Sequence, residues 1–288
     1  MAVERFRMPE DGRLTPEMQI AYRRDGFLVL DGFATPEECA RLRARTDALI
    51  EGFDPGELGT VFSTGAQSHA SEDYFRGSGD KVRFFFEEDA FDDSGTLRVD
   101  KARSINKIGH ALHDLDDDFA AFSHSTKLAA VAESVGIANP GLVQSMVICK
   151  QPRIGGEVGM HQDATFLHTD PVSVTGFWLA LEDADRSNGC LFAVPGGQKG
   201  PLRQRFHYCG DDLVMKELHA APESETGEPL EAPEGTLVVL DGLLPHCSGP
   251  NESPRSRYAY ALHVVDRDAA WSEDNWLRRG PDMPVEGF

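Results

Sequence analysis

Two histidines and one aspartate in this chain have the types and spacing of a mononuclear metal site. His161-Gln162-Asp163 places an imidazole and a carboxylate at positions i and i+2, which point to the same face of an extended chain. His246 follows later in the sequence. Two imidazoles and one carboxylate on one face of a metal leave coordination positions open, as in non-haem Fe(II) oxygenases. The residues therefore predict a ferrous site with His161, Asp163 and His246 as ligands.

Other histidines are weaker candidates for metal binding. A second triplet of the same form, His168-Thr169-Asp170, is followed at once by Pro171, which cannot donate to a central ladder of hydrogen bonds. The pattern favours the first triplet and leaves His168 in a turn or rim. His110 and His113 stand at i and i+3 of a predicted helix. That spacing suits a metal, but a solvated helix face is the simpler expectation.

An arginine near His246 indicates what fills some of the open positions. Arg257 lies on the next expected strand, and its planar guanidinium can bind a carboxylate through two parallel hydrogen bonds. Arg255 competes with it, because residues 255 and 257 share one face of the extended run 255–260. Periodicity alone does not choose between them. Either arginine predicts a small molecule that ends in a carboxylate.

The elements that must position these residues differ along the chain. Thr15-Pro16 and Thr35-Pro36 are helix start signals, the second with Glu38 at capping-box spacing. Gly26 is expected to end the first helix. Strands are predicted at 27–30 and 82–86, a loop at 54–80, and helix in two pieces over 105–135.

After Pro140 short apolar runs alternate with turn residues. The expected strands cover 142–150, 176–181, 190–194, 236–240 and 258–265. Repeated short strands predict a sandwich or barrel such as a jelly roll. We therefore expect a mainly β protein with an α-helical N-terminal layer: a double-stranded β-helix of the jelly-roll, cupin-like type. Residues 1–288 would form one domain, with a helix-rich part of about 1–135 packed on a core of about 140–266.

Composition narrows the class of partner. The chain has 288 residues and a formal net charge of -20, which disfavours nucleic acid and anionic membrane surfaces because both attract basic proteins. The five cysteines are widely spaced without a CxxC pair, which indicates a reducing compartment. No apolar run approaches the length of a spanning helix. These features predict a cytoplasmic protein with a small-molecule substrate and leave its oligomeric state open.

Several blocks of sequence resemble the phytanoyl-CoA dioxygenase family of Fe(II)- and 2-oxoglutarate-dependent oxygenases, in particular its branch of phytanoyl-CoA dioxygenase domain-containing proteins. They include DGFLVLDGF (25–33), SGDKVRFFFE (78–87), SINKIGHALH (104–113), VQSMVICKQPRIGGEV (143–158), HQDATFL (161–167), NGCLFAVPGG (188–197) and SRYAYALH (256–263). The blocks occur in order over nearly the whole chain, which is more specific than the His-x-Asp triplet alone. The family's jelly-roll core agrees with the strand pattern.

The resemblance implies roles for individual residues. His161, Asp163 and His246 match the iron ligands, and Arg257, in preference to Arg255, matches the anchor for the far carboxylate of 2-oxoglutarate. Other positions match residues that line the cosubstrate or active-site pocket in the family, namely Lys107, Met146, Gln162 and Trp178.

The implied activity is a dioxygenase that uses Fe(II), 2-oxoglutarate and O2 to hydroxylate a C–H bond, with release of succinate and CO2. Two alternatives remain: a cupin-like metal-binding protein without oxygenase activity, and a zinc hydrolase, which also uses three ligands and a water. The segments 54–80 and 199–232 are candidate lids. Lys199, Arg203 and Arg205 are expected on a solvated loop, with contact to an anionic substrate as the alternative.

Overall fold

Two sheets packed face to face form the centre of the computed structural model, which describes residues 3–54, 69–92, 96–222 and 225–288. Within these residues the large sheet has the order β1 (Arg5–Arg7), β2 (Phe27–Asp31), β13 (Leu237–Asp241), β8 (Thr175–Ala180), β15 (Arg257–Asp266), β5 (Pro140–Lys150), β4 (Ile105–His110) and β3 (Val82–Phe86). The smaller sheet has the order β12 (Glu228–Leu230), β9 (Leu191–Ala193), β14 (His246–Ser248) and β6 (Val158–His161). The pairing is antiparallel apart from β1 with β2. The predicted jelly-roll fold is thus confirmed.

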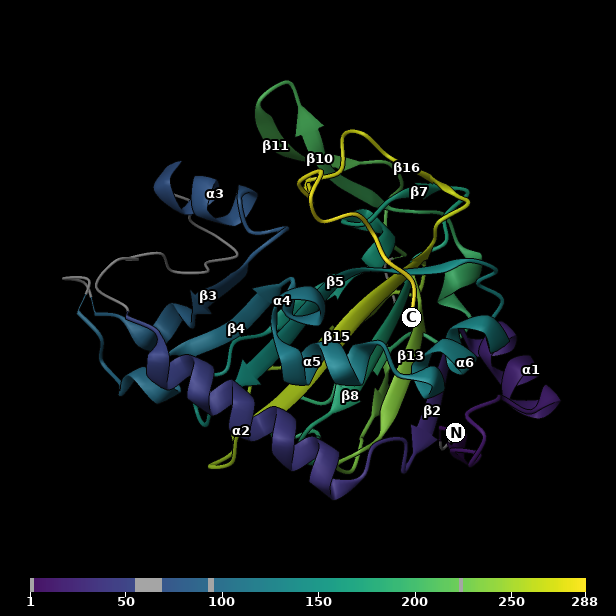
Figure 1. Cartoon of the computed structure of the whole chain (residues 1–288), viewed down its shortest axis with the longest axis horizontal. Helices are drawn as coiled ribbons and strands as arrows, with labels where there is room; N and C mark the ends of the chain where they lie inside the picture. Colours follow the sequence, from purple (N-terminus) through teal and green to yellow (C-terminus); the bar gives the residue numbers. More distant parts are fainter. Residues whose placement is uncertain (1–2, 55–68, 93–95, 223–224) are drawn as a thin grey trace.

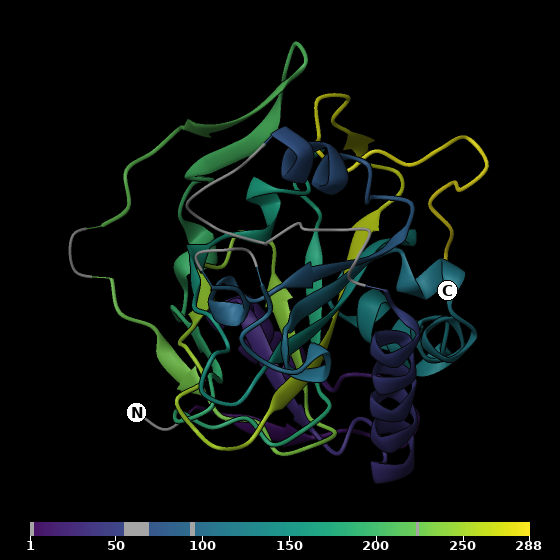
Figure 2. The same ribbon diagram turned by 90° about the vertical axis from the view of Figure 1, so that its left-hand side faces the viewer.

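Most helices cover one face of the large sheet, namely α1 (Pro16–Asp25), α2 (Pro36–Gly52), α4 (Leu112–Leu115), α5 (Asp117–Ser123) and α6 (Thr126–Ser134). Helix α3 (His69–Arg76) instead packs Tyr74 and Phe75 against Phe85, whose side chain points away from the face on which Phe84 and Phe86 join the core beneath the other helices. Figure 1 shows α2, α4, α5 and α6 in front of the sheet, and Figure 2 shows them on one side of it with the chain around β12 on the other. Among the described residues, no helix has the length and apolarity that crossing a bilayer requires.

Both predicted helix starts are confirmed. The Thr35 hydroxyl accepts a hydrogen bond from the Glu38 amide at 3.2 Å, and the Glu38 carboxylate accepts one from the Thr35 amide at 2.8 Å. This reciprocal pair satisfies two backbone donors that the first turn leaves open. Gly26 ends α1 with a φ of 80°, a conformation that favours glycine. The strand β2 then begins at once and lies between β1 and β13 in the large sheet.

Alternation along β15 divides the interior into two cores. Tyr258, Tyr260 and Leu262 pack into the core beneath the helices, while Ala259 and Ala261 face the second core, between the sheets. Side chains two residues apart on a strand share a face, so Arg257 and His263 belong to the alanine side. The small alanines leave space between the sheets for the larger polar groups at either end of the strand.

The expectation of helix over 105–135 is wrong at its start. Residues 105–110 form β4, and His110 and His113 are buried rather than on a solvated helix face. The cause is a bulge: Phe85 pairs with Lys107 and Phe86 with Ile105, so the register shifts by one residue. The bulge spaces the buried Ile105 and Ile108 by three, which imitates helical periodicity.

Two segments predicted to be loops contain regular structure. Helix α3 lies in 54–80, although residues 55–68 of that segment are outside the described residues. The segment 199–232 contains a hairpin of β10 (Gln204–Cys209) and β11 (Asp212–Glu217). Outside this segment, β7 (Thr169–Asp170) pairs with β16 (Ala270–Trp271). Figures 1 and 2 place the hairpin and α3 at the same end of the sandwich.

The basic side chains near the hairpin do not form a free patch. Arg203 pairs with Glu225, and Arg205 pairs with Asp274 at 2.6 Å. The Lys199 ammonium donates to the Arg24 carbonyl at 2.9 Å. Arg203 and Arg205 are thus half-buried and paired, unlike the solvated cluster that the sequence indicated, whereas Lys199 is exposed as expected.

Candidate metal centre

Three side chains that the sequence singled out meet at one edge of the smaller sheet. His161 ends β6 and His246 begins β14, and the two residues are directly paired in the antiparallel register. Asp163 follows in the short 3-10 helix η4 (Asp163–Thr165). The Nε2 atoms of His161 and His246 each lie 3.6 Å from Asp163 Oδ1. Over the described ranges this is the cluster of His, Cys, Asp or Glu side chains that could hold a metal ion, with ligand atoms within 4.8 Å of one another.

Backbone carbonyls orient both imidazoles. His161 Nδ1 donates to the Gly159 carbonyl at 2.8 Å, and His246 Nδ1 donates to the Leu244 carbonyl at 3.0 Å. A proton held on Nδ1 leaves the Nε2 lone pair available, and such contacts are the usual support of histidine ligands. Both Nε2 atoms face Asp163. The rings are therefore prepared to coordinate one ion with the carboxylate.

The protonation states of the cluster also fit a divalent metal. Burial alone would raise the pKa of Asp163, but the neighbouring His263, His246 and His161 hold it well below its usual range. Burial and the charge on His161 lower the pKa of His246 to about 4. At neutral pH Asp163 is a carboxylate and His246 is neutral, which are the ligand forms. Two imidazoles and a carboxylate suit iron, and they also suit zinc.

Gln162, between the two ligands, points elsewhere. Its amide nitrogen donates to the carbonyls of Leu243 at 2.7 Å and Pro201 at 3.2 Å. Its amide oxygen accepts from the Arg203 amide at 2.9 Å. Gln162 thus connects the segment that carries His161 and Asp163 to two loops. A direct contact between Gln162 and a cosubstrate would require breaking these hydrogen bonds.

A glycine on the large sheet makes room for the aspartate. A Cβ at Gly176 of β8 would lie 2.7 Å from Asp163 Oδ2, closer than a real Cβ contact. The absence of a side chain at this position lets the carboxylate rest against the sheet. The cluster is therefore placed between the sheets, with Asp163 at 6% exposure.

One residue that the sequence analysis did not single out lies against the cluster. His263 Nε2 is 3.4 Å from Asp163 Oδ2. His263 is paired with Gly176 in the β15–β8 register. The signal that could have found it is the period of two from Arg257 through Ala259 and Ala261, which puts position 263 on the same face.

Arg257 and Arg255 have different surroundings. Arg257 is 1% exposed, and its Nε and Nη1 atoms have no hydrogen-bond partner among the described residues. Its guanidinium lies 5.4 Å from the centre of the Trp178 ring, and burial lowers its pKa to about 10. Arg255 is exposed and bonds Asp185 at 2.6 Å. Of the two arginines, Arg257 is the one that is buried and available to an anion.

The remaining predicted residues lie on the same face of the large sheet. Met146 and Trp178 are both paired with Ala261 of β15 and pack in the core between the sheets. Lys107 of β4 is paired with Ile148, which packs in the same core. The Lys107 ammonium is 5.1 Å from the centre of the Phe85 ring, and burial lowers its pKa to about 7.

Aromatic rings extend from His161 toward the hairpin. The Phe166 ring is 5.9 Å from His161 and 5.8 Å from Phe206 of β10. Phe206 is 6.1 Å from Phe75 of α3, which stacks on Trp276 at 4.4 Å. One side of the cluster is thus apolar, although the His161 side chain retains 21% exposure. An apolar surround limits water at an open metal position.

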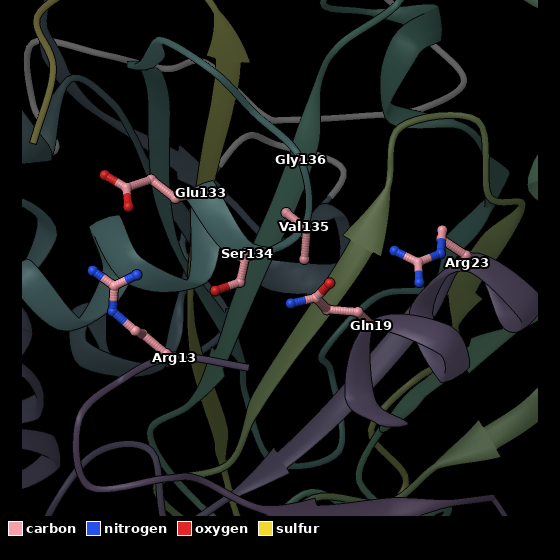
Figure 3. Close-up of a pocket in the computed structure, with 7 residues that line it drawn as sticks. All are labelled: Arg13, Gln19, Arg23, Glu133, Ser134, Val135 and Gly136. Carbon is pink, nitrogen blue, oxygen red and sulfur yellow. The ribbon is translucent and has the colours of Figure 1, made fainter. Parts of the chain in front are cut away.

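A surface hollow between α1 and α6 has no part in this arrangement. It is lined by Arg13, Gln19, Arg23, Glu133, Ser134, Val135 and Gly136 (Figure 3). None of these residues belongs to the metal cluster or to the predicted pocket. His168 and Asp170, the second His-x-Asp triplet, also lie outside the cluster.

Solved structures with a similar fold include proteins that bind iron and 2-oxoglutarate. The epimerase SnoN, solved in complex with Fe3+, alpha ketoglutarate and nogalamycin RO, has a TM-score of 0.66 at 16% identity, covering 94% of this chain and 91% of that one. EctD from S. alaskensis, solved with 2-oxoglutarate and 5-hydroxyectoine, has a TM-score of 0.62 at 17% identity, covering 96% and 91%. At these identities the likeness shows the fold. Together with the His-Asp-His cluster it defines the class, a jelly-roll protein with a candidate metal centre.

Sequence comparison then gives the family. The model of the family "Phytanoyl-CoA dioxygenase (PhyH)" matches residues 22–259. The chain is 46% identical to phytanoyl-CoA dioxygenase 1 of Oryza sativa subsp. japonica, over 96% of this chain and 99% of that protein. It is 43% identical to phytanoyl-CoA dioxygenase domain-containing protein 1 of Bos taurus, over 94% and 97%. The chain belongs to the phytanoyl-CoA dioxygenase family, as its sequence blocks indicated.

Proposed function

We propose that the protein hydroxylates a C–H bond of a small organic substrate, using Fe(II), 2-oxoglutarate and O2. The overall reaction converts R–H, 2-oxoglutarate and O2 into R–OH, succinate and CO2. The observation that carries the proposal is the occurrence together of the His161, Asp163 and His246 cluster and a buried guanidinium at Arg257, whose Nε and Nη1 atoms have no hydrogen-bond partner among the described residues. The structures of SnoN with Fe3+ and alpha ketoglutarate and of EctD with 2-oxoglutarate support the same cofactors.

The three clustered side chains would hold the iron. A ferrous ion bound there would supply the redox chemistry that couples reduction of O2 to decarboxylation of the 2-oxo acid. Asp163 contributes one negative charge, which partly balances the divalent ion, and the backbone bonds of the two histidines keep their Nε2 atoms directed at it. Three protein ligands leave room for a chelating cosubstrate and for O2.

Arg257 would bind the far carboxylate of 2-oxoglutarate. A guanidinium that is 1% exposed, and whose Nε and Nη1 atoms find no partner in the described part of the chain, attracts an anion strongly. Lys107, Met146 and Trp178 would line the same pocket, since they face the core between the sheets. The aromatic residues beside His161 would orient the substrate and exclude water. The free cysteines support the reducing, cytoplasmic location that we propose for the protein.

Two other functions would use the same ligands. A cupin-like protein that only binds metal would not turn over, and a zinc hydrolase would need no O2. In both cases Arg257 would be a buried cation without a role, which is costly in free energy. The oxygenase proposal gives that charge a partner.

Removal of one ligand tests the proposal. We expect the metal-free protein, given Fe(II) and 2-oxoglutarate without oxygen, to develop a weak visible charge-transfer band, and to form succinate once O2 is admitted. His161→Ala, Asp163→Ala and His246→Ala should each lose both signals, because two ligands do not hold the ion. The band is measured by absorption spectroscopy and succinate by chromatography.

His168→Ala is the matched control, since it disrupts the second His-x-Asp triplet and lies outside the cluster. It should keep the band and the succinate. Activity restored by zinc without O2 would instead establish the hydrolase. Equal succinate from the parent and from all three ligand variants would refute the iron site.

A further inference from the structure

His263 stands beside the metal cluster without belonging to it. We propose that His263 is a positioning residue, which holds Asp163 in the orientation that presents one carboxylate oxygen to the metal. This inference rests on the proposed iron site. It concerns how the site is kept in shape, and it adds a residue that neither the cluster nor the carboxylate anchor contains.

The two oxygens of Asp163 have different neighbours. Oδ1 lies 3.6 Å from Nε2 of both His161 and His246, so this oxygen faces the space that a metal would share with the two imidazoles. Oδ2 lies 3.4 Å from His263 Nε2 and has no hydrogen-bond partner among the described residues. A buried carboxylate oxygen without a partner is unfavourable. The imidazole of His263 is the group placed to stabilise it.

The local structure fixes this contact from both sides. The Asp163 carboxylate packs directly on Gly176, where an added Cβ would lie 2.7 Å from Oδ2. A Cβ there would also lie 3.8 Å from the ring of His263, so all three positions meet at one point. His263 is 7% exposed and sits in the continuous pairing of β15 with β8, at a register shift in the pairing of β15 with β5. Its ring is therefore held by the sheet rather than by a loop.

The two oxygens of Asp163 then have different roles. A hydrogen bond donated by His263 to Oδ2 occupies that oxygen and leaves Oδ1 for the metal. The carboxylate then takes one coordination position and preserves the positions needed by cosubstrate and O2. Groups that orient a ligand in this way usually change metal affinity about 10- to 100-fold when they are removed.

A pair of amide substitutions isolates the Nε2 contact. The amide nitrogen of Gln reaches the place of the imidazole Nε2, whereas that of the shorter Asn corresponds to Nδ1. His263→Asn should weaken binding of Co(II) to the metal-free protein about tenfold or more and change its visible absorption bands. His263→Gln should restore most of the affinity and the parent band shape. The measurement is a Co(II) titration followed by absorption, which requires no turnover.

His113→Gln provides the matched control. His113 is also a buried histidine, but it bonds the Ser145 hydroxyl at 2.8 Å beneath the helices and does not contact Asp163. It should bind Co(II) like the parent. Thermal melting of each metal-free variant shows whether the fold is retained. The comparison of Co(II) affinity between His263→Gln and His263→Asn isolates the Nε2 contact, because both variants replace the ring by an amide.

The outcomes separate this inference from the proposed function. Parent-like Co(II) affinity and bands in His263→Asn would overturn the positioning role. Equal weakening in the Asn and Gln variants would overturn it as well, because a general loss of packing would then explain both. Failure of the parent to form succinate, with normal Co(II) binding and the expected difference between the variants, would count against the oxygenase function alone.

Discussion

At the residue scale, the most informative side chain beyond the ligands is Arg257. Its guanidinium is buried, and two of its nitrogens have no partner in the described part of the chain. Burial moves its pKa from 12.5 to about 10, which corresponds to about 3 kcal/mol of unfavourable free energy for the charged form. A protein keeps such a group where a ligand neutralises it. A substitution that removes the charge at this position should therefore raise the stability of the cosubstrate-free protein and lower its affinity for the ligand.

Replacing Arg257 by an apolar side chain should reveal that opposition. In Arg257→Met we expect the free energy of unfolding of the cosubstrate-free protein to rise by about 1–3 kcal/mol, since an unpaired buried charge is removed. Binding of 2-oxoglutarate should lose about 2–5 kcal/mol, since its far carboxylate loses its partner. Denaturant unfolding measures the first quantity, and anaerobic titration of the iron charge-transfer band measures the second.

Arg255→Met is the control for this experiment. Arg255 is 55% exposed at its side chain and pairs with Asp185, so its loss should change stability by less than about 1 kcal/mol. It should leave 2-oxoglutarate binding unchanged. If Arg257→Met titrates with 2-oxoglutarate like the parent, Arg257 is not the anchor.

Prediction from sequence was uneven at this scale for a physical reason. His161 and Asp163 are two residues apart in sequence, and His246 is distinguished by its position after a strand and turn, so short patterns suggest all three. The importance of His263 depends on its contact with Asp163, which joins β15 of the large sheet to η4, the 3-10 helix after β6 of the smaller sheet. The sequence shows which face His263 shares with Arg257, but not which residue from another element meets it there.

At the element scale, β4 shows how a local pattern can mislead. The bulge opposite Phe85 and Phe86 brings Ile105 and Ile108 to a helix-like spacing in a strand. Pairing with β3 and β5 overrides the local preference, because it satisfies the backbone of β4 on both sides. The same change of element buries His110 at the end of β4 and His113 at the start of α4.

This burial predicts how stability depends on pH. Burial and the nearby Arg279 lower the pKa of His113 to about 3 in the folded protein, whereas an exposed histidine titrates near 6.5. Between these values only the unfolded chain binds the proton, so acid favours unfolding. The stabilising contribution is fully present above pH 6.5 and is lost as the pH falls toward 3. Each pH unit in that window removes about 1.4 kcal/mol.

His113→Gln should flatten this dependence. Between pH 6 and pH 4.5 we expect the variant to lose about 2 kcal/mol less stability than the parent, although its stability at pH 8 is lower because the ring fills a buried site. Urea unfolding at a series of pH values gives both slopes. Equal slopes would show that His113 is not the group that takes up the proton. The comparison is His124→Gln, which replaces a partly buried histidine whose Nδ1 donates to the Gly287 carbonyl.

At the scale of the whole molecule, the jelly roll was predictable because its strands repeat a simple pattern. The predicted strands at 142–150, 176–181, 236–240 and 258–265 correspond to β5, β8, β13 and β15, with bounds that differ by one or two residues. Their order in the sheet was not predictable, since it depends on pairings between distant segments. In the structure β2, from the N-terminal part, lies beside β13, and β4 and β3 extend the sheet beyond β5.

This strand order bears on domain organisation. The N-terminal part of about 1–135 contributes both helices and strands, and its β2 and β4 are bonded to strands of the jelly-roll core. The core beneath the helices contains residues of both parts, for example Leu42 of α2, Phe119 of α5 and Tyr260 of β15. We therefore propose that residues 1–288 fold as a single domain rather than as two units joined by a linker.

A single domain should unfold in one step. We expect urea unfolding to give coincident curves by far-ultraviolet circular dichroism, which reports the helices, and by tryptophan fluorescence, which reports the C-terminal half of the chain through Trp178, Trp271 and Trp276. Removal of residues 1–135 would leave the edges of β13 and β5 unpaired and the apolar face of β15 uncovered, and such edges aggregate. The fragment 136–288 should therefore be insoluble or molten. Two separated transitions, or a fragment that is soluble, monomeric and cooperatively folded, would show instead that the helix-rich part is a separate unit.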